Sequence, residues 1–285
     1  MCCNKNQPSN LGSSETLREA PQKFNFNDYK KYGHPKHLKK IDSNFLEWFI
    51  GFSEGDGSFS KNFSFVINQK DPQLLFKIKK QLGFGSVYET SESGIWRYCV
   101  TGQENCLRLF YLFNGNLILK KTQKRFLNWL TDIKMKVTVK PFQTNISLNN
   151  GWLSGFIDAD GGFHARIRKN SNYKLKVMFC KKFYLTQKGE TALLKNIGIL
   201  LDSKTKVYSF IQKENIYSRI DITSLKSQTI LLNYLSIYPL LSRQNITVCI
   251  WKKMHGYQER RENLNESGIL KLSHLCFQLK KHNKN

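Results

Sequence analysis

The sequence predicts an α+β protein built from two similar halves. Two short segments are near-copies of each other: residues 49–57 read FIGFSEGDG and residues 153–161 read LSGFIDADG. The segments that follow each copy also recur in the same order, which indicates an internal duplication. Each half offers a helix that carries the motif, two strands, an amphipathic helix, a second strand pair and closing helices that end in a tryptophan.

The ends of the halves are marked by changes in composition. Residues 1–40 are polar, contain three prolines and end in a basic run, so we expect a partly ordered basic extension. We expect the first half to span 41–130 and the second to span 149–285, with a link at 131–148 that is rich in Lys, Thr and Asn. The basic tail from residue 270 onward is expected to form a solvated helix.

The first motif lies on a predicted helix. N-cap candidates stand just upstream of it, at Asp42, Ser43 and Asn44. Large apolar residues then recur at helical spacing and form one stripe, at Phe45, Trp48, Phe49 and Phe52.

Small residues lie four apart on one face of each motif helix. They are Gly51 and Gly55 in the first copy and Gly155 and Ala159 in the second. Another backbone can come very close to such a face, so we expect the two helices to pack against each other about a pseudo-twofold axis. The alternative is that glycine merely ends each helix. The repetition of the small residues, each time followed by Asp-Gly, favours the packed pair.

Each motif ends in an acid, Asp56 in the first copy and Asp160 in the second. Packed helices would place both carboxylates at helix C-termini, where partial negative charge makes them costly unless cations enter. Oxygen ligands favour Mg²⁺ or Mn²⁺ over zinc. The alternative is an Asp-Gly turn that only starts a hairpin. The earlier acids Glu54 and Asp158 point to another face, and we interpret them as helix-end or interface residues.

The repeat continues beyond the motifs. The matched segments are 65–70 with 183–188, 71–83 with 189–201, 95–101 with 217–223 and 117–129 with 239–251. The offset between matched residues grows from 104 (Asp160 against Asp56) to 122 (Trp251 against Trp129). The second half should therefore have the longer first hairpin. Both tryptophans are expected in the core.

The charge of the chain indicates a polyanionic partner. The 45 Lys and Arg residues outnumber the 21 Asp and Glu residues, which gives a net charge of +24 and a pI near 9.8. Because the cations are spread along the chain, nucleic acid is favoured over an acidic membrane surface. No segment approaches twenty apolar residues, so no membrane-spanning helix is expected.

The cysteines and the amino-acid composition indicate the cellular compartment in which the protein is expected. The chain has seven cysteines and no CxxC pair, which argues against a disulfide framework and a structural zinc site and fits a reducing compartment. Only four alanines occur beside many Lys, Asn, Ile and Phe residues. This bias is typical of an AT-rich genome and hints at an organelle, either mitochondrion or chloroplast.

The strands after each motif alternate between apolar and polar residues. In residues 57–65 we expect the phenylalanines on the inner face, and polar side chains at two-residue spacing suit a β-ribbon in the major groove of DNA. A merely solvated face is the alternative. The candidate DNA-binding residues are Ser58, Ser60, Asn62, Ser64 and Arg97 in the first half and His164, Arg166, Arg168, Lys174, Lys176 and Arg219 in the second.

These features together resemble the LAGLIDADG homing endonucleases, in particular the monomeric type with two motifs in one chain. The resemblance covers about residues 41–255, and the departures are Ser53 and Glu54 in the first motif and Ser154 in the second. It implies an αββαββα fold for each half, motif helices packed at the centre, and two antiparallel sheets that form a DNA-binding saddle.

The resemblance also implies a metal site. Its ligands would be the carboxylates of Asp56 and Asp160 and the backbone carbonyls of Gly55 and Ala159. A glutamine at the end of the second strand of each half would help hold water there, which places Gln69 and Gln187 at the site.

A basic rim at the start of each closing helix is implied as well. In the first half Lys120 and Lys121 fall there, and in the second half Arg243 and Gln244. In the alternative register, shifted by one residue, Thr122 corresponds to Gln244. The difference between the two rims predicts that the two DNA strands are cut at unequal rates.

The expected function is a site-specific double-strand DNA endonuclease that acts as a monomer with Mg²⁺ or Mn²⁺. The resemblance implies a long pseudo-palindromic site and short 3′ overhangs. One alternative is an intron-encoded RNA maturase that binds its host intron RNA on the same fold. Loss of the motif acids would favour this alternative, but both Asp56 and Asp160 are present. Another is a non-catalytic packaging or ribosome-associated protein, against which the repeated motif speaks.

Overall fold

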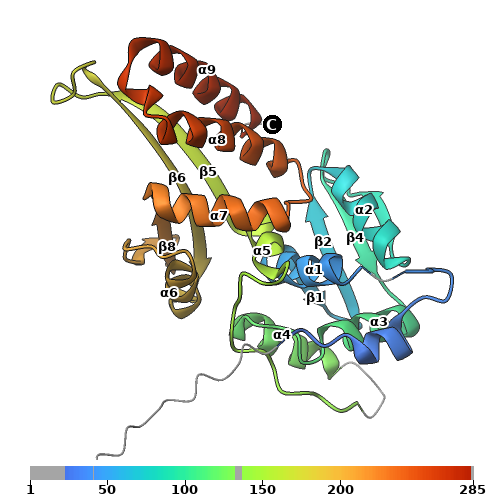
Figure 1. Cartoon of the computed structure of the whole chain (residues 1–285). Coiled ribbons are helices and arrows are strands. Elements are labelled where there is room, and N and C mark those ends of the chain that lie inside the picture. Colours follow the sequence, from blue (N-terminus) through green and yellow to red (C-terminus); the bar gives the residue numbers. More distant parts are fainter. Residues whose placement is uncertain (1–22, 41, 132–136, 284–285) are drawn as a thin grey trace, which may run out of the picture.

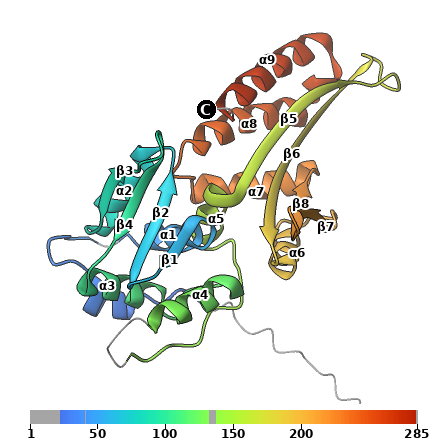
Figure 2. The same ribbon diagram turned by 180° about the vertical axis from the view of Figure 1, so that it is seen from behind.

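The strands of this computed structural model repeat one arrangement twice. The structure describes residues 23–40, 42–131 and 137–283. Within these ranges the strands form two four-stranded antiparallel sheets, with the orders β1-β2-β4-β3 and β5-β6-β8-β7. Figures 1 and 2 show the sheets on either side of the central helices α1 and α5. The predicted α+β fold with two pseudo-symmetric halves is therefore confirmed.

The helices and strands follow the predicted order in both repeats. The first repeat comprises α1 (Ser43–Asp56), β1 (Gly57–Ser60), β2 (Ser64–Gln69), α2 (Pro72–Leu82), β3 (Ser86–Glu89), β4 (Trp96–Val100), α3 (Gln103–Phe113) and α4 (Lys120–Leu130). The second comprises α5 (Trp152–Asp160), β5 (Gly161–Lys169), β6 (Val177–Lys188), α6 (Thr191–Leu200), β7 (Tyr208–Gln212), β8 (Asn215–Ile222), α7 (Leu225–Ile237) and α8 (Gln244–Glu259), followed by η2 (Glu262–Leu264) and α9 (Glu266–His282). Among the described residues, no helix combines the length and the apolar character needed to cross a membrane.

The two motif helices pack through their small faces, as predicted. Asp42 caps α1 by accepting hydrogen bonds from the backbone of the first turn. A Cβ added at Gly51 would lie 2.0 Å from the carbonyl oxygen of Trp152, and one added at Gly155 would lie 1.8 Å from that of Trp48. No side chain fits at either position, so glycine is required for this approach of the two backbones.

The predicted core tryptophans cover the inner faces of the two sheets. Trp129 of α4 packs on Phe59 of the first sheet, with ring centroids 5.2 Å apart. Trp251 of α8 packs on Phe163 of the second sheet at 5.3 Å. Both tryptophans are buried. Among the described residues, helices cover the inner faces, whereas outer-face residues such as Ser58 and His164 are exposed and can contact a ligand.

The prediction that the phenylalanines of residues 57–65 lie on the inner face is confirmed, because Phe59, Phe63 and Phe65 pack in the core, but the prediction that Asn62 lies on the outer strand face was wrong. The chain turns between β1 and β2, where Asn62 and Phe63 have positive φ angles of 59° and 52°. Ser60 pairs with Ser64 across this hairpin. Asn62 therefore lies in the turn, while Ser58, Ser60 and Ser64 share the outer face of two strands. Alternation alone does not reveal such a turn, because both strands continue the same pattern.

The first hairpin of the second half is longer, as predicted, but the C-terminal tail does not form a solvated helix. Figures 1 and 2 show α8 and α9 lying along the extended β5–β6 hairpin. Leu272 and Leu279 of α9 are buried, and Asn283 Nδ2 donates a hydrogen bond of 3.1 Å to the carbonyl oxygen of Phe163. The apolar stripe of the tail is thus part of the core of the second half.

The residues before the first motif pack onto the first half. Phe26 and Tyr29, the latter in η1 (Tyr29–Gly33), are buried. The backbone nitrogen of Asn25 donates to Asn116 Oδ1 at 2.9 Å, and Gln143 Nε2 donates to the carbonyl oxygen of Lys23 at 3.2 Å. The predicted extension and link lie partly outside the described residues, but their described parts thus contact each other and the first half.

Candidate active site and nucleic-acid interface

The motif acids meet at the adjoining C-terminal ends of α1 and α5. A Cβ added at Gly55 would lie 2.4 Å from Ala159 Cβ and 2.7 Å from Asp160 Oδ2. Burial and the negative charge of Asp160 raise the pKa of Asp56 to about 7. Burial also raises the pKa of Asp160. The two carboxylates therefore share a poorly hydrated site in which their charges repel each other.

Each motif acid is held by the glutamine that was predicted from its own half. Gln69 Nε2 donates a hydrogen bond of 2.7 Å to Asp56 Oδ2, and Gln187 Nε2 donates one of 2.5 Å to Asp160 Oδ2. Gln69 is the last residue of β2, and Gln187 is the last but one of β6. The two pairs are thus equivalent under the pseudo-symmetry.

One rim lysine crosses from the first half to the second motif acid. Lys121 Nζ donates a hydrogen bond of 2.6 Å to Gln187 Oε1. Burial lowers the pKa of Lys121, against the opposing charges of Asp160 and Glu190. Lys120 begins α4 and is exposed. Of the two predicted lysines, the structure therefore brings Lys121 to the acids.

Two further acids, interpreted from the sequence as interface residues, cross-link the motif helices. Glu54 and Asp158 are 0% and 5% exposed. Trp152 Nε1 donates to Glu54 Oε2 at 2.6 Å, and Trp48 Nε1 donates to Asp158 Oδ2 at 2.9 Å. The sequence analysis placed Trp48 only in an apolar stripe and did not identify either tryptophan as a partner of a buried acid. Their spacing (152 − 48 = 104) equals that of the motif acids, and this signal could have identified them.

The buried acids also fix which rim residues correspond. Glu54 Oε1 accepts a hydrogen bond of 2.7 Å from the backbone nitrogen of Leu119, and Asp158 Oδ2 accepts one of 3.2 Å from that of Ser242. The offset is therefore 123 (242 − 119), which matches Lys121 with Gln244 and excludes Thr122. Where the first half has a lysine, the second half has a neutral amide.

Gln244 contacts the start of β5. Its Nε2 donates to the carbonyl oxygen of Gly161 at 3.3 Å. Its Oε1 is buried and has no hydrogen-bond partner among the described residues. Arg243 and Gln244 line the same hollow as Asp56 and Gln69, which has a volume of about 420 Å³. The second rim is thus placed beside the first motif acid.

The donor set of this centre fits a hard divalent cation. The carboxylates of Asp56 and Asp160 would bind it together with the carbonyls of Gly55 and Ala159, which lie in last helical turns where backbone oxygens lack helical partners. Within the described ranges, no group of three or more His, Cys, Asp or Glu side chains could hold a metal. Such a centre matches Mg²⁺, which keeps water and phosphate oxygens as further ligands, better than a closed zinc site.

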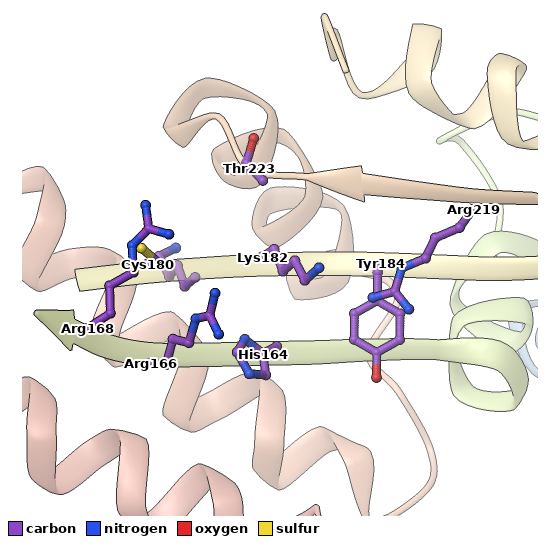
Figure 3. A pocket seen from close by; sticks show the side chains of 9 residues that line it. His164, Arg166, Arg168, Cys180, Lys182, Tyr184, Arg219 and Thr223 are labelled. Carbon is purple, nitrogen blue, oxygen red and sulfur yellow. The ribbon is translucent and has the colours of Figure 1, made fainter. Parts of the chain in front are cut away.

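The outer face of the second sheet forms a basic hollow of about 470 Å³. Figure 3 shows His164, Arg166 and Arg168 along β5 and Arg219 on β8 around it. Four predicted DNA-binding residues thus lie on one surface, while Lys174 and Lys176 lie in the turn beyond it. Sequence reasoning missed Lys182, Tyr184 and Asp221, although the alternation of β6 and β8 places them on the same face.

The outer face of the first sheet is shorter and less charged. Ser58 is exposed there, whereas Ser60 and Ser64 are half-buried. Arg97 of β4 donates from its Nε to Asn68 Oδ1 of β2 at 2.8 Å. Asn68 was not predicted, although it stands next to Gln69. The two sheets therefore present different chemistry to a ligand.

Comparisons with known proteins agree with this architecture. The family model described as LAGLIDADG endonuclease matches residues 153–255. A Neurospora crassa protein named probable intron-encoded endonuclease 4 is 33% identical over 225 residues, which cover 75% of this chain and 40% of that relative. A Schizosaccharomyces pombe protein named uncharacterized cox1 intron-2 37.2 kDa protein is 30% identical over 277 residues, which cover 91% of this chain and 79% of the relative.

A solved structure shares the fold. The I-LtrWI LAGLIDADG homing endonuclease, bound to its target DNA, superposes with a TM-score of 0.66 at 19% identity and covers 82% of this chain and 97% of its own. The fold, the paired motifs and the sequence relatives agree with one another. This chain belongs to the LAGLIDADG endonuclease family.

Proposed function

We propose that this protein is a site-specific endonuclease that hydrolyses both strands of a long, pseudo-palindromic DNA site and leaves short 3′ overhangs. The observation that carries the proposal is the pair of half-buried motif carboxylates, Asp56 and Asp160, each held by its own glutamine. A repulsive carboxylate pair is costly to the fold, and a divalent cation held by the two carboxylates would relieve this cost.

Asp56 and Asp160 would hold Mg²⁺ or Mn²⁺ together with the carbonyls of Gly55 and Ala159. When bound, the metal supplies Lewis-acid stabilisation of the charge that develops on the phosphate and on the leaving oxygen. The chain's own part is to fix the carboxylates in place. Gln69 and Gln187 do this through their amide N–H groups.

Lys121 would contribute to one of the two centres. Its ammonium lies at Gln187 and close enough to Asp160 for the two charges to interact. Because burial lowers its pKa, Lys121 Nζ is a better proton donor toward a leaving oxygen than an exposed lysine would be. In the matched place beside Asp56, Gln244 can supply a hydrogen bond but no charge.

The outer faces of both sheets would lie in the major groove, where the edges of the base pairs are distinguishable. The excess of Lys and Arg residues would neutralise phosphates, so binding should weaken steeply with added salt. Because both motifs are in one chain, a monomer would suffice. The names of the relatives support a gene carried in an intron, with organelle origin as in the cox1 relative.

Cleavage of a randomised DNA library tests this function. The full chain is incubated with Mg²⁺, with Ca²⁺ as the metal control and the double variant Asp56→Asn/Asp160→Asn as the protein control. We expect cuts at one long site in Mg²⁺ and in neither control. Tight DNA binding without cleavage in Mg²⁺ would contradict the proposal and would move the test to intron RNA.

A further inference from the structure

Two matched arginines on the outer faces are each oriented through the same atom. Arg97 Nε donates to Asn68 Oδ1 at 2.8 Å, and Arg219 Nε donates to Asp221 Oδ1 at 2.8 Å. Neither arginine donates from its terminal nitrogens to another described residue. In each arginine, Nε thus fixes the side chain, and the terminal nitrogens Nη1 and Nη2 can bind a ligand.

The guanidinium of Arg219 is also fixed by stacking. It lies 3.9 Å from the centroid of the Tyr184 ring, and Figure 3 shows the two groups side by side on the outer face. The side chain of Arg219 is 22% exposed. A planar group held at its Nε and at one face has few other orientations available, so a ligand that binds it loses little further entropy.

Asp221 is unusual because it is an acid on a surface suited to DNA. Its Oδ1 accepts from Arg219, and its Oδ2 accepts from Lys182 Nζ at 2.6 Å. Burial alone would raise its pKa, but the hydrogen bonds and charges of Lys182 and Arg219 outweigh burial, so the pKa is lowered. Since both oxygens are engaged, Asp221 is poorly placed to accept a hydrogen bond from a base. Its chemistry fits a residue that positions its neighbours.

Both arginines stand at the same place relative to the catalytic centre. In the register of the first sheet Arg97 is paired with Asn68, the residue directly before Gln69. In the second sheet Arg219 is paired with Thr186, directly before Gln187. The two arginines therefore lie at matched positions in the two sheets, each one strand residue away from the level of the glutamine that holds a motif acid.

We propose that Arg97 and Arg219 each bind a guanine, one in each half-site at matched positions, and that Asn68 and Asp221 are positioning residues. The inference rests on the proposed DNA binding. Paired arginine nitrogens match O6 and N7 of guanine in the major groove, and no other base offers two acceptors there in this geometry.

Binding selection tests this without requiring cleavage. The full chain in Ca²⁺ is used to select sites from randomised double-stranded DNA, in parallel with Arg219→Lys, Arg97→Lys and Asp221→Ala. We expect guanine at two matched positions for the wild type. Each lysine variant should lose the preference at one position by about tenfold to a hundredfold and keep the other, so that the two variants control each other. Substituting 7-deazaguanine, which lacks the N7 acceptor, should reproduce each loss in the wild type.

Asp221→Ala distinguishes positioning from a purely structural role. A positioning role predicts weaker preference for guanine opposite Arg219, with unchanged or tighter binding to unrelated DNA because a negative charge has been removed. Equal weakening on all DNA together with a lower Tm would overturn that role. Selection of sites without guanine at these positions, or of no sequence, would overturn the whole inference. Binding with this pattern but no cleavage in Mg²⁺ would instead overturn only the proposed endonuclease activity.

Discussion

The two halves of the proposed catalytic centre have the same acids and glutamines but different rims. Beside Asp160, a chain of hydrogen bonds runs from Lys121 through Gln187 to the carboxylate. Beside Asp56, Gln69 contacts the carboxylate in the same way, but the residue matched to Lys121 is Gln244. The site beside Asp160 therefore contains a half-buried cation that the site beside Asp56 lacks.

This difference follows from how tightly each position is packed. Gly51 and Gly155 have no space for a Cβ, and the acids Glu54 and Asp158 are buried at the helix interface, so the halves stay alike there. The rims and the outer faces of the sheets are partly exposed, so packing restricts the side chains less at these positions. Packing thus maintains the pseudo-symmetry at the centre, while its surface can differ between the two half-sites.

The largest expected effect is the loss of either motif acid. Asp56→Asn and Asp160→Asn should each reduce cleavage of the selected site by at least about a hundredfold, the scale for removing one group that stabilises the transition state. Binding of the same DNA in Ca²⁺ gives the control and should be largely retained. Full activity in either single variant would mean that the two centres do not both depend on their acid.

The rim difference predicts a smaller and strand-specific effect. Lys121→Met should slow cutting of the strand beside Asp160 by about tenfold to a hundredfold, since general-acid and charge assistance contribute on that scale or above. Gln244→Lys should speed cutting of the other strand. Single-turnover assays with each strand labelled separately measure this. Equal slowing of both strands by Lys121→Met would contradict the assignment of Lys121 to one centre.

The buried acids extend the comparison to stability. Trp152→Phe leaves Glu54 with two backbone donors, whereas Trp48→Phe leaves Asp158 with two backbone donors and the hydroxyl of Ser242. A hydrogen bond to a charged group contributes about 1.5–3 kcal/mol. We expect both variants to lower the free energy of unfolding in urea, and Trp152→Phe to lower it more. If Trp48→Phe lowered the free energy of unfolding more, the number of remaining hydrogen-bond donors would not determine how well each buried acid is tolerated.

The last comparison concerns the inner faces of the sheets. Lys181 occupies the place that Phe63 has in the first half, where the Phe63 ring lies 4.3 Å from that of Trp129. Lys181 Nζ lies 3.9 Å from the Trp251 ring and contacts His255 Nδ1 at 2.7 Å. Gln228 Oε1 accepts from Lys181 at 2.6 Å, and Glu259 contacts the other nitrogen of His255.

Burial lowers the pKa of Lys181 to about 7, against the opposing charge of Glu259. In the unfolded chain its pKa is near 10.5, so between pH 7 and pH 10 the unfolded state binds more protons and stability rises with pH. We expect this rise, up to about 1.4 kcal/mol per pH unit for one proton, to be smaller in Lys181→Met. Tm measured from pH 7 to pH 10 tests this, with the exposed Lys188→Met as the control. Parallel curves for all three proteins would contradict it.

The sequence predicted the positions that follow from the duplication itself. The glycine faces, the motif acids and the glutamines were found because each occurs twice, and the structure brings them together at one place. The rim register was not predictable, since the offset drifts along the chain and only the contacts of Glu54 and Asp158 with backbone nitrogens fix it. The turn at Asn62 was missed because its positive φ angle leaves no trace in the alternation of side chains.

Strand-resolved cleavage of the selected site by the wild-type chain in Mg²⁺ tests the central claim most directly. The unequal rims predict a nicked intermediate, cut first in the strand beside Asp160, Gln187 and Lys121, and a slower second cut that completes the break. Cleavage of both strands at the same rate, with no nicked intermediate, would contradict the claim that one chain contains two unequal catalytic centres.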